Sequence, residues 1–112
     1  MDDISLAELM RAVEKALPYT SQNYPGLPAI SGAGDTALAC ALHHAQLHQT
    51  KALGVFAAML EPRDHGEELP LDRELIKRTL VKQVGNALRV LVALGLTPEQ
   101  VHDSLLAEFK PR

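Results

Sequence analysis

Apolar residues recur every three or four positions along most of this chain, which is the spacing that places them on one face of an α-helix. Four such segments can be drawn, over residues 5–17, 35–60, 72–94 and 98–109. None of them shows the strict alternation of a half-buried β-strand. The pattern therefore predicts a single all-α domain over residues 1–112, in which two long antiparallel helices pack with two shorter ones.

Local signals at the segment ends support these boundaries. The sequences SLAE at residues 5–8 and TPEQ at residues 97–100 have the form of a capping box, which satisfies the first free amides of a helix. Asp35 is the expected N-cap of the second helix and Pro62 its expected end. Gly95 stands where a helix commonly ends on a left-handed residue.

Residues 19–34 lack any helical or strand pattern and contain three glycines and two prolines. Apolar residues are interspersed among them, so we expect an ordered loop. The turn from Ser31 to Asp35 resembles a phosphate-cradling loop before a helix. It lacks a lysine, and the Asp35 carboxylate would repel a phosphate, so we interpret it as a helix cap.

The two long segments carry side-chain amides within their apolar faces. Gln46 and Gln49 are three residues apart, as are Gln83 and Asn86, so each pair shares one side of its helix. Gln49 and Gln83 fall in the middle of rows of apolar residues, where a polar group normally needs a hydrogen-bond partner. These rows are formed by Leu38, Leu42, Ala45, Ala52, Phe56 and Leu60 and by Ile76, Leu80, Ala87, Val90, Leu91 and Leu94.

This layout resembles the all-α nucleoside triphosphate pyrophosphohydrolases, the MazG and dimeric dUTPase superfamily, over roughly residues 35–109. In that family, acidic pairs on two successive long helices hold magnesium, which positions a triphosphate for attack by water. The corresponding positions here are Gln46, Gln49, Gln83 and Asn86. The resemblance implies a shared scaffold, and magnesium as a cofactor only if catalysis is retained.

The change from acids to amides alters the expected chemistry. A carboxylate brings a full negative charge to a hard dication, whereas an amide brings only a dipole. We therefore expect loss of magnesium-dependent hydrolysis, with a neutral pocket that can bind a nucleotide or another small polar ligand. The alternative is an oligomeric interaction module without a small-molecule site, in which the two glutamines bond each other and fix the helix register.

A third hypothesis is a metal site on the second helix. His44 and His48 are four residues apart, which lets two imidazoles reach one metal ion. Zinc would need at least one more ligand. The available candidates are His102, Asp103, Glu67 and Glu68. We favour a half-exposed pair of histidines over a zinc site.

Composition narrows the class of protein. The chain has 112 residues, 46% of them hydrophobic and only 4% aromatic, which suits a core of helices packed on helices. The net charge is −3 with no basic block, so we expect no nucleic-acid surface. No uncharged stretch is long and apolar enough for a membrane span, and the acidic N-terminus lacks a signal-peptide pattern. The lone Cys40 excludes an internal disulfide, and together these features predict a cytoplasmic protein.

The third segment has a second apolar stripe, formed by Val81, Leu88 and Val92. A helix that is apolar on two sides is covered on two sides. In a chain of this length, the second stripe predicts a homodimer or a tetramer.

Overall fold

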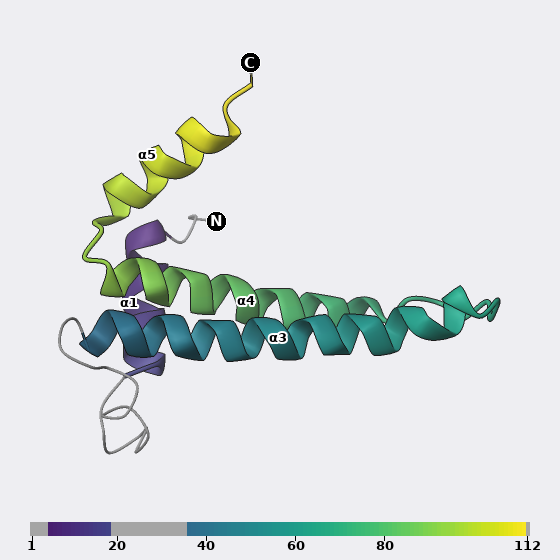
Figure 1. Cartoon of the computed structure of the whole chain (residues 1–112). Helices are drawn as coiled ribbons and strands as arrows, with labels where there is room; N and C mark the ends of the chain where they lie inside the picture. Colours follow the sequence, from purple (N-terminus) through teal and green to yellow (C-terminus); the bar gives the residue numbers. More distant parts are fainter. Residues whose placement is uncertain (1–4, 19–35, 112) are drawn as a thin grey trace.

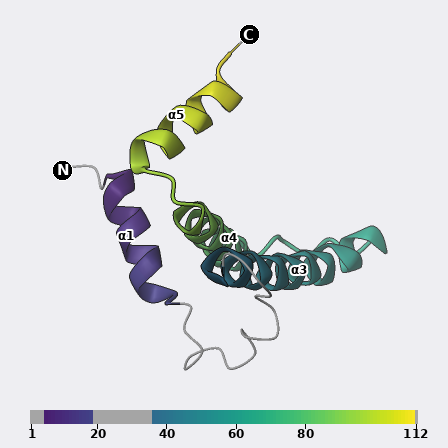
Figure 2. The same cartoon turned by 60° about the vertical axis from the view of Figure 1, so that its left-hand side comes forward.

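The computed structural model describes residues 5–18 and 36–111, and the regular secondary structure of this part of the chain is all α-helix, without a strand. It contains α1 (Leu6–Ala16), α3 (Thr36–Asp64), α4 (Arg73–Ala93) and α5 (Pro98–Phe109). The two long helices α3 and α4 lie side by side and antiparallel, α1 crosses one face of this pair, and α5 leads away from it (Figure 1, Figure 2). The predicted all-α class with four helices is confirmed, while the loop and the Asp35 cap lie outside the described residues.

The helix starts follow from side chains that accept the first free backbone amides. Ser5 Oγ accepts from the backbone N–H of Glu8 at 3.1 Å, and Asp72 Oδ1 does the same for α4. At α5, Thr97 Oγ1 accepts from the N–H of Gln100 at 3.1 Å, and Gln100 Oε1 accepts from the N–H of Thr97 at 2.9 Å. The capping box predicted at residues 97–100 is therefore complete.

The expected end of the second helix at Pro62 is wrong, because α3 continues to Asp64 with Pro62 in its last turn. A proline costs most in a helix interior, and here the helix ends two residues later. The end is formed by Gly66, whose φ is +88° and whose N–H donates to Arg63 O at 3.1 Å. Glu67 N–H donates to Pro62 O at 2.9 Å, which completes the paired bonds of a glycine C-cap.

The end of α4 repeats this motif, as the sequence predicts at Gly95. Gly95 has a φ of +83°, and its N–H donates to Val92 O at 2.9 Å. Leu96 N–H donates to Leu91 O at 3.3 Å. A residue with a Cβ would be strained at this φ, so the position favours glycine.

One side of α4 holds α1. Arg89, which is 7% exposed, donates from Nε to the carbonyl of Leu17 at 2.8 Å, just beyond the end of α1. Gly85 faces α1, because a Cβ added there would lie 3.9 Å from Val13 Cγ1, an ordinary contact distance. This side of α4 is therefore closed by the chain itself.

The apolar side chains buried within the described part of the chain are few and mostly small. They are Met10, Cys40, Ala41, Ala52 and Val101. Fourteen large apolar side chains of residues 5–18 and 36–111 are exposed, among them several from the two rows expected to be buried. Leu42, Leu60, Leu80 and Leu94 are 57%, 52%, 45% and 52% exposed, which corrects the expectation that these rows pack within one chain.

The shape is correspondingly extended. The radius of gyration of the Cα atoms is 17.1 Å, whereas a compact domain of this length has about 13 Å. Among the described helices, none is by itself long and apolar enough to cross a membrane. Only α4 and α5 taken together pass that criterion, across a bend of 120°.

Candidate functional site

A cavity of about 250 Å³ lies between α3 and α4 and contains three of the four amides singled out from the sequence. It is lined by Ala45, Gln49, Gln83, Asn86 and Ala87. Gln46 is exposed and does not line this cavity. The antiparallel pairing of the two long helices thus brings Gln49 to the Gln83 and Asn86 pair and leaves Gln46 outside.

Asn86 is the most informative of these residues. Its side chain is only 7% exposed, yet no hydrogen bond within residues 5–18 and 36–111 reaches its amide. A buried amide without a partner costs about 1–3 kcal/mol. The described residues therefore leave this amide at the wall of the cavity without a hydrogen-bond partner from the protein.

The two glutamines do not close the cavity by pairing. Gln49 is exposed and Gln83 is half-buried. No hydrogen bond joins their side chains in the part of the chain that the structure describes. Their donors and acceptors remain available to a third group, since each amide offers an N–H₂ and a carbonyl oxygen.

The chemistry of this cavity is neutral and hydrogen-bonding. No carboxylate lines it, so its donors do not fit magnesium, which binds through carboxylates and phosphates. Pockets for drug-sized ligands measure about 300–1,000 Å³. A cavity of about 250 Å³ suits one small planar polar group, and two or three amides can read the edge of such a group.

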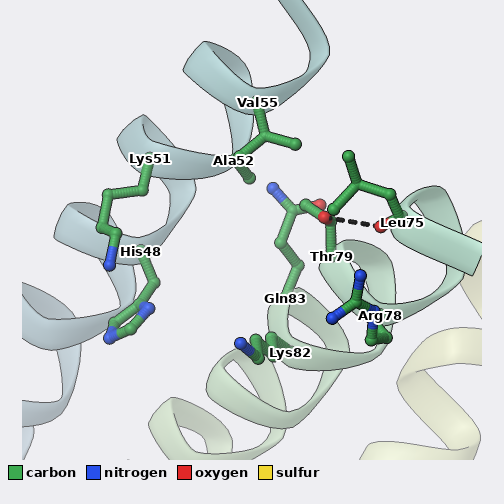
Figure 3. A pocket seen from close by; sticks show the side chains of 9 residues that line it. All are labelled: His48, Lys51, Ala52, Val55, Leu75, Arg78, Thr79, Lys82 and Gln83. Carbon is green, nitrogen blue, oxygen red and sulfur yellow. Dashed lines mark hydrogen bonds between the residues drawn. The ribbon is translucent and has the colours of Figure 1, made fainter. Parts of the chain in front are cut away.

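A second cavity, also of about 250 Å³, is cationic and was not foreseen from the sequence. It is lined by His48, Lys51, Ala52, Val55, Leu75, Arg78, Thr79, Lys82 and Gln83 (Figure 3). Gln83 belongs to both cavities. Thr79 donates from Oγ1 to Leu75 O at 2.7 Å, so its hydroxyl is already used within α4.

The charge of this second cavity has a local origin. Arg78 and Lys82 are four residues apart on α4, and Lys51 lines the same cavity from α3, next to His48 (Figure 3). Like charges at this helical spacing disfavour the helix slightly unless an anion lies nearby. No acid lines the cavity, although the net charge of the chain is −3. The spacing of Arg78 and Lys82 was visible in the sequence, but the approach of Lys51 depends on the helix pairing.

The histidine pair is close but offers only two ligands. The ring centroids of His44 and His48 lie 4.3 Å apart, with the planes tilted by 48°. Partial burial lowers the pKa of His44, and the nearby His48 and His43 lower it further. Among the described residues, no group of three or more metal-binding side chains occurs, and His102 instead contacts Asp103 at 3.2 Å on α5.

Cys40 is 1% exposed, and burial raises the pKa of its thiol. A protonated, buried thiol is a poor nucleophile. Cys40 is therefore a buried packing residue of α3.

Comparison with known proteins adds no relative. No protein-family model, curated protein or solved structure matches this chain. The resemblance to the all-α pyrophosphohydrolases thus rests on the order of helices and the spacing of the amide pairs.

Proposed function

We propose that the cavity between α3 and α4 binds a small neutral polar group, such as the base of a nucleoside or nucleotide, without magnesium-dependent hydrolysis. On this proposal the chain is a degenerate relative of the all-α pyrophosphohydrolases that keeps the scaffold and has lost the metal-binding acids. A cytoplasmic location, where nucleotides are abundant, belongs to the same proposal.

The observation that carries this proposal is the buried amide of Asn86. It lines the cavity at 7% exposure without a hydrogen-bond partner among the described residues. A ligand that bonded this amide would supply the hydrogen-bond partner that the described residues do not. Gln49 and Gln83 line the same cavity and supply further donors and acceptors, which supports recognition of a group with both.

The test is a thermal-shift titration of the full chain with nucleosides and with nucleoside mono-, di- and triphosphates, each with and without magnesium. A ligand that binds only the folded state raises the melting temperature, by an amount equivalent to about 1.4 kcal/mol at ten times its Kd. We expect stabilisation by at least one nucleoside or nucleotide, with no effect of magnesium. An Asn86→Leu variant should lose the shift, and a Ser104→Ala variant, at an exposed position on α5 outside the cavity, should keep it.

Two results would count against this proposal. A shift that required magnesium would mean that acids outside the cavity hold a metal. The absence of a shift with every nucleoside and nucleotide would remove the support for a nucleotide pocket.

The second candidate is an oligomeric interaction module without a small-molecule site. The exposed apolar side chains on both long helices favour it, because a domain that works alone rarely exposes large contiguous apolar patches. The titration separates the two candidates, since a module without a pocket gives no shift with any ligand.

A further inference from the structure

Two rows of residues with the repeat of a coiled coil run along α3 and α4. The α3 row advances in steps of four, three, four, three and four residues, and the α4 row in steps of four, three, four and three. Such alternating steps keep one seam of a helix facing a partner helix over several turns. The α3 row is Leu42, Gln46, Gln49, Leu53, Phe56 and Leu60, and the α4 row is Leu80, Val84, Ala87, Leu91 and Leu94.

The two rows lie on the same face of the α3–α4 pair. Gln49 of the α3 row and Ala87 of the α4 row line the same cavity, so both rows border it. The other face of the pair is where α1 packs, through Gly85 and Arg89 (Figure 2). The rows therefore lie opposite α1, and no described helix covers them (Figure 1).

Side chains in a seam between packed helices are normally buried, whereas most of the large apolar side chains in these two rows are exposed. Leu53 is 64% exposed and Val84 is 59% exposed, near the middle of their rows. Six of the eight large apolar side chains in the two rows are exposed. None of the residues that make up the two rows is charged.

We infer that a second copy of this chain packs on this face, so that α3 and α4 of two protomers form a four-helix bundle. An interface around a two-fold axis must be complementary to itself. Two uncharged apolar faces meet this condition, whereas a face of one charge would repel its copy. Glutamines inside otherwise apolar rows fit the same assembly, because a polar residue within a seam fixes its register.

The chain as a whole exposes more surface than a compact monomer of its size. The chain exposes 8637 Å², whereas a folded monomer of its mass is expected to expose about 6,100 Å². A standard stable interface buries roughly 800 Å² per partner, and the exposed side chains of the two rows are the ones that a second copy would cover. This inference does not depend on whether the amide cavity binds a ligand, because the apolar rows carry it alone.

The test is sedimentation equilibrium of the full chain, with glutamate variants in matched pairs. Leu53→Glu and Val84→Glu place a charge in the rows. Leu47→Glu and Val81→Glu place it on equally exposed apolar positions outside them, since Leu47 and Val81 are 52% and 63% exposed. We expect a mass twice the 12.2 kDa of one chain for the unaltered protein.

The symmetric interface contains each substitution twice. If the substitution in each copy weakens association tenfold, the dimer Kd of a row variant rises about 100-fold. The control variants should change it by less than about threefold, a small surface effect. A 12.2 kDa species at high concentration would overturn the inference, as would control variants that dissociate as readily as the row variants.

A row variant that fails to fold does not remove the test. The melting temperature of the unaltered chain must rise with its own concentration if a second copy stabilises the fold. A melting temperature independent of concentration would contradict the inference, whatever the variants do.

Discussion

Replacing Asn86 with leucine tests whether its amide lacks a partner. The side chain is 7% exposed, and no described hydrogen bond reaches it. Burying an unsatisfied amide costs about 1–3 kcal/mol, and an apolar group of similar size removes that cost. We therefore expect the Asn86→Leu substitution to raise the free energy of unfolding by about 1–2 kcal/mol. For a domain of this length, that gain raises the melting temperature by about 4 °C per kcal/mol.

The measurement is urea denaturation at a fixed protein concentration. A stabilised variant shifts the midpoint while the slope of free energy against urea stays the same. An Asn86→Ala variant should gain less, because it removes the amide but enlarges the cavity. Ser104→Ala serves as the control, since Ser104 is exposed on α5, outside the cavity, and its change should stay within about 0.5 kcal/mol.

The reasoning fails if Asn86→Leu destabilises the protein by more than about 1 kcal/mol, the size of a lost hydrogen bond. That result would mean that the amide has a partner and that the cavity is a closed polar contact. A gain in stability together with loss of the nucleoside shift would instead show that Asn86 is kept for binding rather than for folding.

Three further substitutions test other parts of the structure. Truncating Arg89 to alanine removes its bond to Leu17 O and leaves that carbonyl without this donor, so unfolding free energy should fall by about 2–4 kcal/mol in urea titrations. Gly66→Ala should destabilise the protein by about 1 kcal/mol because the φ of Gly66 is +88°. Gly54→Ala should stabilise it by about 0.5–1 kcal/mol, because Gly54 lies in α3 with open space around it. Changes in melting temperature of the same sign for the two variants would refute this comparison. The pKa of folded His44 lies below its ordinary value of 6.5, so the unfolded chain binds more protons and stability falls as pH drops from 6.5 through the lower folded pKa; a His44→Gln variant should flatten this part of the stability profile.

Features that depend on a few neighbouring residues were predictable from the sequence. The capping box at Thr97 and the glycine C-cap at Gly95 need only local spacing, and both formed as expected. The predicted helix end at Pro62 was wrong because a proline near the end of a helix does not by itself fix the residue at which the helix stops. Here the glycine at position 66 ends the helix, and Pro62 is tolerated within the last turn.

Features that depend on the pairing of helices distant in sequence were harder to predict from the sequence. A three-residue step places Gln46 and Gln49 on one side of α3, but about 60° apart around the helix axis. That angle is enough for Gln49 to line the cavity while Gln46 stays outside it. The cationic cavity was missed for the same reason, since Lys51 joins Arg78 and Lys82 only when α3 and α4 are in register.

The apolar rows show a different limit of sequence reasoning. Periodicity identifies which side chains need cover but does not say whether the same chain or another provides it. Leu42 and Leu80 carry the pattern of buried residues, yet both are exposed in the single chain. The second stripe at Val81 led to the expectation of an oligomer, whereas the rows through Leu53 and Val84 offer the longer uncharged face.

The proposed cavity and the inferred dimer share a surface, and this predicts a thermodynamic link between them. Gln49 and Ala87 belong to the rows and also line the cavity, so a second copy on this face would cover it. Hydrogen bonds to a ligand strengthen when water is excluded, and a ligand that binds the dimer more tightly must stabilise the dimer by the same factor. Sedimentation with and without a stabilising nucleoside should therefore show a lower dimer Kd with the ligand. The dimer-weakened Leu53→Glu variant should bind the nucleoside less tightly, although position 53 does not line the cavity. Equal nucleoside affinity in the monomeric variant and the unaltered protein would show that each cavity works alone.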